Sequence, residues 1–119
     1  MYVLVAKDGE YSEKEFLVAG ISAKPYDIVV SIAKDYLTKW TKTLFDHHNA
    51  LSSKYVTREW PLEDLHTVWS YICWSDESNT WFLNHTGGKP PDLFYRCESF
   101  RVEIVSIELN TLHFMEIEY

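Results

Sequence analysis

The sequence predicts an α+β fold, in which a mostly antiparallel β-sheet carries one principal α-helix, at about residues 25–47, packed on one face. Apolar residues recur at spacings of three and four over the predicted helix, whereas short apolar or alternating runs separated by turn residues fill most of the remaining chain. The chain of 119 residues with 46% hydrophobic content is expected to form a single domain, residues 1–119.

The chain begins with two short apolar runs, which predict an antiparallel pair of strands. Residues 2–6 are continuously apolar with β-branched members, which is typical of a strand buried on both faces. Gly9 permits the positive φ of a turn, and residues 16–21 form the second run. A polar, acidic loop is therefore expected to join the two strands.

The principal helix is predicted from a change of period after Pro25, which is a typical first-turn residue. The apolar stripe comprises Val29, Ala33, Tyr36, Trp40 and Leu44. The pattern fades near residues 46–49, where we expect the helix to end.

The middle of the chain predicts a hairpin and leaves one segment open. Pro61 followed by two acids favours a helical turn, while the β-branched and aromatic residues at 68–74 favour a strand. Residues 61–73 are consistent with either a helix or a strand. The turn cluster at 75–79, followed by the apolar run at 81–83, predicts a hairpin, and residues 86–92 form a loop.

The last part of the chain predicts two strands, at residues 94–109 and 112–119. Phe100, Val102 and Ile104 alternate on one parity, and the apolar residues from Val105 onward alternate on the other. Such a slip by one residue predicts either a β-bulge near Ile104 and Val105 or a strand that changes the surface on which it packs.

The opening of the chain resembles that of small phage and bacterial proteins of unknown function. The similar segments are residues 2–5, Gly9-Glu10-Tyr11-Ser12-Glu13 and Ala19-Gly20-Ile21-Ser22, which precede the predicted helix. That family opens with a strand, a G-x-Y-S-[DE] turn, a second strand ending in G-[VI]-[FY]-S, and a helix. The likeness covers about residues 2–40, and Ile21 stands where the family has an aromatic residue. It implies a phage or bacterial setting and no particular chemistry.

Composition narrows the functional classes. A net charge of −7 disfavours direct contact with nucleic acid or anionic membranes and favours partners with a basic surface. No apolar run approaches the length of a membrane span, and no signal peptide is recognised, so we expect a cytoplasmic protein with free thiols.

Polar clusters with potential chemistry have simpler structural explanations. Residues Asp46-His47-His48-Asn49 contain adjacent histidines, whose side chains diverge on a helix instead of forming the i,i+4 pair that metals use. No ligand spacing connects the other histidines with the two cysteines, namely His66, His85, His113, Cys73 and Cys97. We therefore expect no metal, no cofactor and no enzymatic activity.

The best candidate sites are the two hairpin loops, because each combines acidic residues with an aromatic residue, as contact rims and anchors do. The predicted partner-binding residues are Tyr11, Glu13, Glu15, Trp74, Asp76, Glu77 and Trp81.

The resulting hypothesis is a non-enzymatic protein that inhibits or modulates a protein partner, in the phage setting a counter-defence inhibitor. One alternative is an immunity or antitoxin protein that neutralises a basic toxin. Another is a small-molecule or nucleotide-binding domain that forms a homo-oligomer, with a pocket lined by Trp69, Tyr71 and Trp81.

Overall fold

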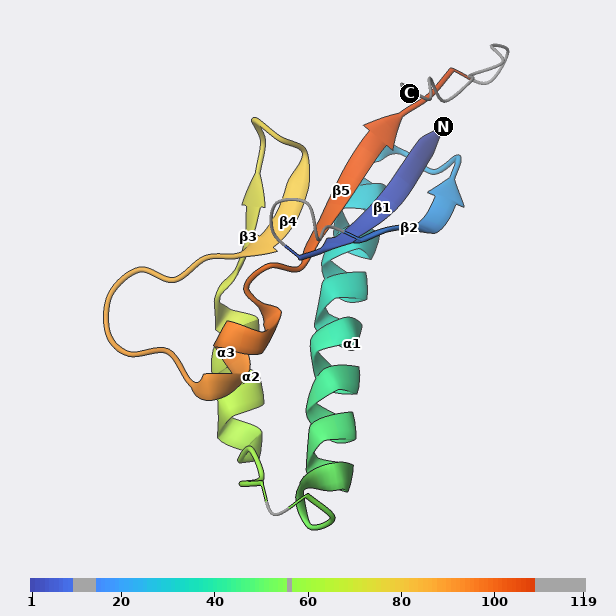
Figure 1. Ribbon diagram of the computed structural model, residues 1–119. Coiled ribbons are helices and arrows are strands. Elements are labelled where there is room, and N and C mark those ends of the chain that lie inside the picture. Colours follow the sequence, from blue (N-terminus) through green and yellow to red (C-terminus); the bar gives the residue numbers. More distant parts are fainter. Residues whose placement is uncertain (10–14, 56, 109–119) are drawn as a thin grey trace, which may run out of the picture.

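The computed structural model describes residues 1–9, 15–55 and 57–108. Figure 1 shows a sheet with a long helix running behind it and two shorter helices below. In chain order the elements are β1 (Tyr2–Asp8), β2 (Glu15–Ser22), α1 (Tyr26–Ser52), α2 (Leu62–Ser70), β3 (Ile72–Ser75), β4 (Thr80–Leu83), α3 (Asp92–Cys97) and β5 (Arg101–Ser106). The sheet has the order β2-β1-β5-β4-β3, and every neighbouring pair is antiparallel. The predicted α+β class is confirmed.

The two predicted hairpins are both present. β1 pairs with β2 from Tyr2 opposite Ser22 to Asp8 opposite Glu15, and β3 pairs with β4 around the turn at residues 76–79. The predicted position of the bulge is wrong, because β5 pairs with β1 in continuous register. The register shift lies in the first hairpin, where Ala19 is the extra residue of β2. The change of parity along β5 arises because Val105 is an apolar residue on the other face of the sheet.

The segments around residues 68–70 and 94–97 are helical, not extended. α2 takes the helical alternative for residues 62–70 and ends before β3, so only residues 72–75 form the predicted strand. The prediction of a strand from residue 94 is wrong, because α3 occupies residues 92–97. Pro91 precedes that helix, and Leu93, Phe94 and Cys97 bury their side chains on one side of it. A helical spacing of three and four thus outweighs the local strand propensity.

α1 is longer than predicted and serves two apolar clusters. Its N-terminal half places Val29, Ala33 and Leu37 against β1 and β5, and its C-terminal half places Phe45 against α2 and α3. The fully buried row is therefore offset by one residue from the predicted stripe in the second half of the helix, where Trp40 is half-buried. The helix continues to Ser52 because hydrogen bonds from Asn49 to Trp60 and from Ser52 to Glu59 hold its last turn, and no local pattern shows these contacts.

Trp40 connects the two clusters. Its ring stacks on Phe100 with centroids 3.8 Å apart and planes at 6°, and its side chain contacts both the sheet-side cluster and the cluster around α2 and α3. Ile72 is the other half-buried residue that contacts both clusters among the described residues. Apart from the backbone segments that pass between them, the sheet half and the helical half of the molecule therefore share these two half-buried side chains.

The side of the sheet facing away from α1 carries an exposed apolar patch on β2, β1 and β5, and Figure 1 shows no labelled helix over these strands. We call this side the open sheet face. By register Val3 lies between Ile21 and Val105, and Val5 lies beside Val18. Val18 is 60% exposed, Ile21 65% and Val105 38%.

Candidate functional site

Aromatic rings gather where the tip of the β3–β4 hairpin meets the start of α1. The ring of Tyr26 lies 5.5 Å from that of Tyr2 and 6.4 Å from that of Trp74. Two exposed acids, Asp76 and Glu77, follow Trp74 at the hairpin turn, and the indole N–H of Trp74 donates to Asp76 Oδ1 at 2.8 Å. We call these five residues the aromatic acidic end.

The hairpin tip is held to α1 and β5 through Asn79. The hydroxyl of Tyr26 donates to Asn79 Oδ1 at 2.7 Å, and the backbone carbonyl of Asn79 accepts the N–H of Ile104. Asn79 has a φ of 49°, a left-handed conformation that asparagine tolerates better than most residues. Partial desolvation, followed by the charges of Asp76 and Tyr2, raises the pKa of Tyr26, so its hydroxyl remains a hydrogen-bond donor at neutral pH.

Trp81 fixes the same hairpin from the helix-facing side of the sheet. Its indole N–H donates to the carbonyl of Val30 at 2.7 Å, and its ring lies 5.4 Å from that of Trp74. The ammonium of Lys34 lies 5.4 Å above the Trp81 ring, which is a cation–π distance. Trp74 and Trp81 are both half-buried, and the contact between their rings helps to position Trp74.

The sequence-predicted site residues do not all come together. Trp74, Asp76, Glu77 and Trp81 share the second hairpin, whereas Glu15 pairs with Asp8 at the opposite end of β1 from Tyr2. Tyr11 and Glu13 lie outside the described residues. The sequence did not identify Tyr2 and Tyr26 as site residues, because only the folded sheet and helix bring them beside Trp74.

Residues of the polar cluster at 46–49 hold the end of α1 against the loop that follows it through hydrogen bonds and ring stacking. The His48 ring stacks on Trp60 with centroids 3.5 Å apart and planes at 12°, and its Nε2 lies 2.8 Å from the Arg58 carbonyl. Asn49 Oδ1 accepts the N–H of Trp60 and Asn49 Nδ2 donates to the Trp60 carbonyl. In the described part of the chain no three His, Cys, Asp or Glu side chains are grouped as a metal site requires.

The two cysteines are free thiols, and Cys97 lies in the apolar cluster around α2 and α3. Cys97 is fully buried, and that burial raises the pKa of its thiol to about 12, so it remains protonated at neutral pH. Since the thiolate is the reactive form, Cys97 is a packing residue of the cluster around α3 and not a nucleophile.

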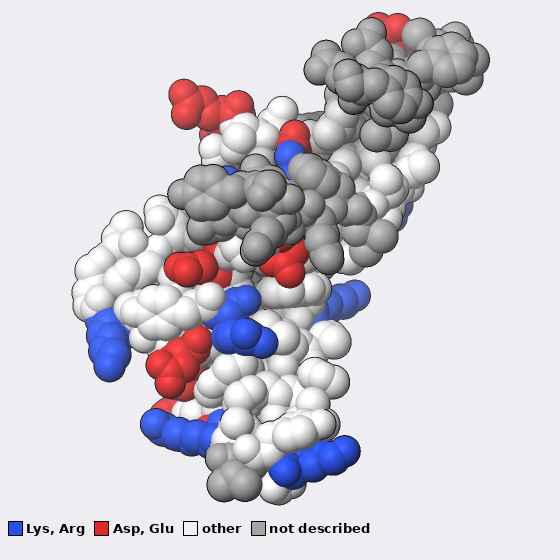
Figure 2. Space-filling model, in the orientation of Figure 1, with Lys and Arg blue, Asp and Glu red and all other residues white. Residues whose placement is uncertain are grey.

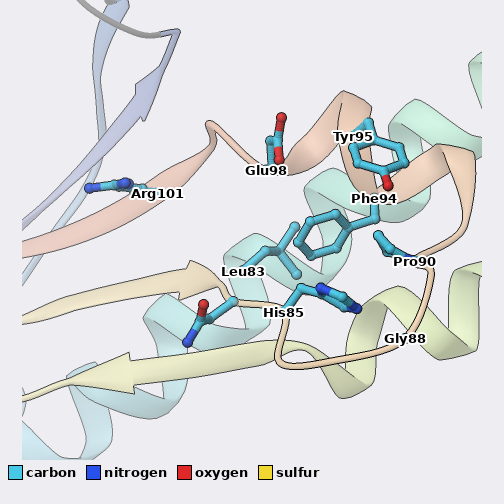
Figure 3. Close-up of a pocket in the computed structure, with 9 residues that line it drawn as sticks. Leu83, His85, Gly88, Pro90, Phe94, Tyr95, Glu98 and Arg101 are labelled. Carbon is cyan, nitrogen blue, oxygen red and sulfur yellow. The ribbon is translucent and has the colours of Figure 1, made fainter.

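A shallow pocket of about 500 Å³ lies between the end of β4, the following loop and α3. Figure 3 shows Phe94 and His85 adjacent at its centre, with Tyr95 to one side and the Arg101 side chain directed away from them. None of the three residues predicted to line a pocket, Trp69, Tyr71 and Trp81, lines this one. The indole N–H of Trp69 instead donates to Thr41 Oγ1 at 2.8 Å. The pocket is lined by Leu83, Asn84, His85, Gly88, Pro90, Phe94, Tyr95, Glu98 and Arg101.

His85 is the unusual residue of this pocket. Its ring contacts Tyr71 and Phe94 edge-on, with centroids 5.3 and 5.8 Å away, and its Nε2 is buried without a hydrogen-bond partner among the described residues. Gly87 and Gly88, with φ values of 83° and 69°, turn the loop beside it. A buried polar atom without a partner costs stability, and such an atom in a native structure calls for an explanation, of which a functional role is one.

We expect the substitution His85→Phe to raise the free energy of unfolding by about 1 kcal/mol, because it keeps the aromatic contacts and removes the unpartnered nitrogen. Urea denaturation of the variant and the parent measures the difference. Thr86→Ala, at an exposed neighbouring position, is the matched control and should change little. A variant less stable than the parent would contradict this interpretation of His85.

No described helix is both long and apolar enough to cross a membrane. The contacts described above define two candidate sites, the aromatic acidic end and the pocket around His85.

Comparison of the chain with protein-family models, with curated proteins and with solved structures finds no match.

Proposed function

We propose that this chain is a small cytoplasmic, non-enzymatic protein that binds a protein partner through its aromatic acidic end and thereby inhibits or modulates that partner. The observation that carries the proposal is the meeting of Tyr26 and Trp74 beside two exposed acids. Aromatic anchors next to charged rim residues are the usual composition of protein-binding surfaces.

The aromatic residues of this end belong to rigid elements. Tyr26 is the first residue of α1 and is 38% exposed, while Trp74 lies on β3 and is braced by Trp81. Hydrogen bonds to Asn79 and Asp76 hold the Tyr26 hydroxyl and the Trp74 indole in place. Groups that are ordered before binding lose little conformational entropy in the complex, which favours affinity.

The charge of this end favours a basic partner. Figure 2 shows acidic side chains projecting at the tip of the β3–β4 hairpin. Ion pairs in the described part of the chain engage Glu103 and Asp46, and neither Asp76 nor Glu77 has such a pair. A lysine or arginine of a partner would meet carboxylates beside aromatic faces, and Lys34 over Trp81 shows that a cation already lies against one aromatic ring of this hairpin.

The proposal predicts that the double substitution Asp76→Lys/Glu77→Lys weakens partner binding by about tenfold or more, because it turns attraction into repulsion. Affinity capture from the host lysate identifies the partner, and titration calorimetry with the purified partner then gives the dissociation constants. The dependence of affinity on salt should decrease in the same variant.

The matched control is Asp35→Lys/Asp46→Lys, which makes the same change of net charge on exposed positions of α1. It should retain affinity within about threefold, since charges remote from an interface act weakly through screened solvent. Equal affinities of the parent and the hairpin variant would exclude the aromatic acidic end as the contact.

The phage counter-defence inhibitor and the immunity or antitoxin protein are two versions of this proposal, because both neutralise a partner with a basic surface. They differ in the identity of the captured protein, which is a host defence component in the first case and a toxin in the second. The gene neighbourhood provides an independent distinction between them.

A second candidate function is the binding of a small polar molecule in the pocket around His85, which the unpartnered Nε2 favours. Its volume is within the range of ligand sites, about 300–1,000 Å³. A metabolite panel screened by thermal shift tests it, and a genuine ligand should lose its effect on the His85→Phe variant. A panel without any shift would remove this candidate.

A further inference from the structure

β2 is an edge strand of the described sheet, and it lacks most of the features that protect such edges. It pairs with β1 on one side, and no described strand pairs with it on the other. Natural edge strands are protected by lysines, prolines, short length or bulges, because their free backbone groups otherwise pair with another chain. The eight residues of β2 include no lysine, arginine or proline, and the bulge at Ala19 is its one such feature.

Apolar side chains adjoin this edge. Val18 and Ile21, both on β2, are 60% and 65% exposed, and Val105 continues the same patch across β1. Exposed apolar residues that are contiguous along a strand mark interaction surfaces more often than isolated ones do. An occupant of the edge must therefore offer both free backbone groups and apolar side chains.

We propose that the occupant is a second copy of this chain, whose β2 pairs antiparallel with β2 of the first around a twofold axis. In the register that places Val18 opposite Ile21 of the second copy, both strands have two residues between these positions. Ala19, the extra residue of each bulge, then lies opposite Gly20 of the other copy, so the bulges do not interrupt the pairing. The two exposed apolar patches become one on the open sheet face.

The same register pairs opposite charges at both ends of the interface. Continued outward by three residues from Val18 and Ile21, which extends the pairing two residues beyond the end of β2 at Ser22, the same register places Glu15 opposite Lys24 of the second copy, and the twofold axis repeats that pair. Lys24 is exposed, and Pro25 after it lacks the N–H that a longer ladder would need. This charge complementarity favours a second copy over an unrelated strand. It also favours antiparallel pairing, since in-register parallel strands would set Glu15 against itself.

Sedimentation velocity of the full chain, from low micromolar to near-millimolar concentration at moderate salt, tests the proposal. We expect a concentration-dependent dimer. Val18→Lys/Ile21→Lys should raise the dimer dissociation constant by about thirtyfold or more, because it places charges at the apolar contact. Both positions are exposed, so circular dichroism should show a folded variant.

The charge pairs test the register itself. Lys24→Glu sets like charges opposite each other at both ends and should weaken the dimer by about tenfold, and Glu15→Lys/Lys24→Glu should restore it to within about threefold. The matched control Lys39→Glu changes an exposed lysine on α1 and should have no effect beyond that of net charge.

Three results would each overturn the proposal: a monomer at every concentration, a dimer that Val18→Lys/Ile21→Lys leaves intact, and a charge swap that fails to restore Lys24→Glu. None of these results bears on the aromatic acidic end, because its partner binding is measured separately.

Discussion

Replacement of Trp40 by alanine is expected to lower the free energy of unfolding by about 3–5 kcal/mol. The loss has two sources, the buried aromatic surface and the stacking on Phe100 at 3.8 Å. Because Trp40 contacts both apolar clusters, its removal should also weaken the coupling between the sheet half and the helical half. Urea denaturation followed by far-ultraviolet circular dichroism and by fluorescence measures both effects.

Two controls distinguish this role from a general sensitivity of α1. Trp40→Phe keeps an aromatic face against Phe100 and should recover most of the stability, while Lys39→Ala, at an exposed neighbour, should cost less than about 0.5 kcal/mol. If the two probes give coincident transitions in the alanine variant, the coupling does not depend on this side chain. A loss below about 1 kcal/mol would contradict the packing argument.

The substitution Asn49→Ala is expected to cost about 2–3 kcal/mol, because one side chain satisfies both the N–H and the carbonyl of Trp60. These two hydrogen bonds fix the segment between α1 and α2 to the end of α1. Without them Trp60, which is 9% exposed, loses the backbone anchor that holds its ring against His48. The free energy of unfolding and the hydrogen exchange of the Trp60 amide are the measurements.

Asn49→Asp separates the two hydrogen bonds. It keeps the acceptor for the Trp60 N–H but places a carboxylate oxygen against the Trp60 carbonyl, so we expect it to be at least as destabilising as alanine. His47→Ala, at the exposed neighbouring position, should be within about 0.5 kcal/mol of the parent. Unchanged exchange of the Trp60 amide in Asn49→Ala would show that the segment is held by other contacts.

The elements that were predicted correctly from the sequence are those indicated by residues close together in the chain. The turn residues at 75–79 and the flanking apolar runs predict the β3–β4 hairpin, and the residues after Pro25 predict α1. Residues 68–70, which the sequence left open, and residues 94–97, which it predicted wrongly as a strand, are helical for the same reason. Aromatic residues occur in both segments and Val68 is β-branched, and packing between α2 and α3 makes the segments helical despite that composition.

The candidate site was predictable only in part. Trp74, Asp76 and Glu77 are adjacent in sequence, so an acidic turn beside an aromatic residue is visible there. Tyr2 and Tyr26 are far from that turn in sequence, and they join it because β1 and α1 begin at the same end of the sheet as the hairpin tip. The unpartnered nitrogen of His85 has no signal in sequence, since burial depends on the whole fold.

By itself the sequence determined the α+β class, the two hairpins, the principal helix and the acidic charge, because these depend on periodicity, turn chemistry and composition over short stretches. The tertiary structure alone decided the strand order, the length of α1, the helical state of residues 92–97 and the grouping of the aromatic acidic end. The physical reason is that these features depend on contacts between residues distant in the chain. Such contacts contribute more free energy than local propensity, which amounts to less than about 1 kcal/mol per residue.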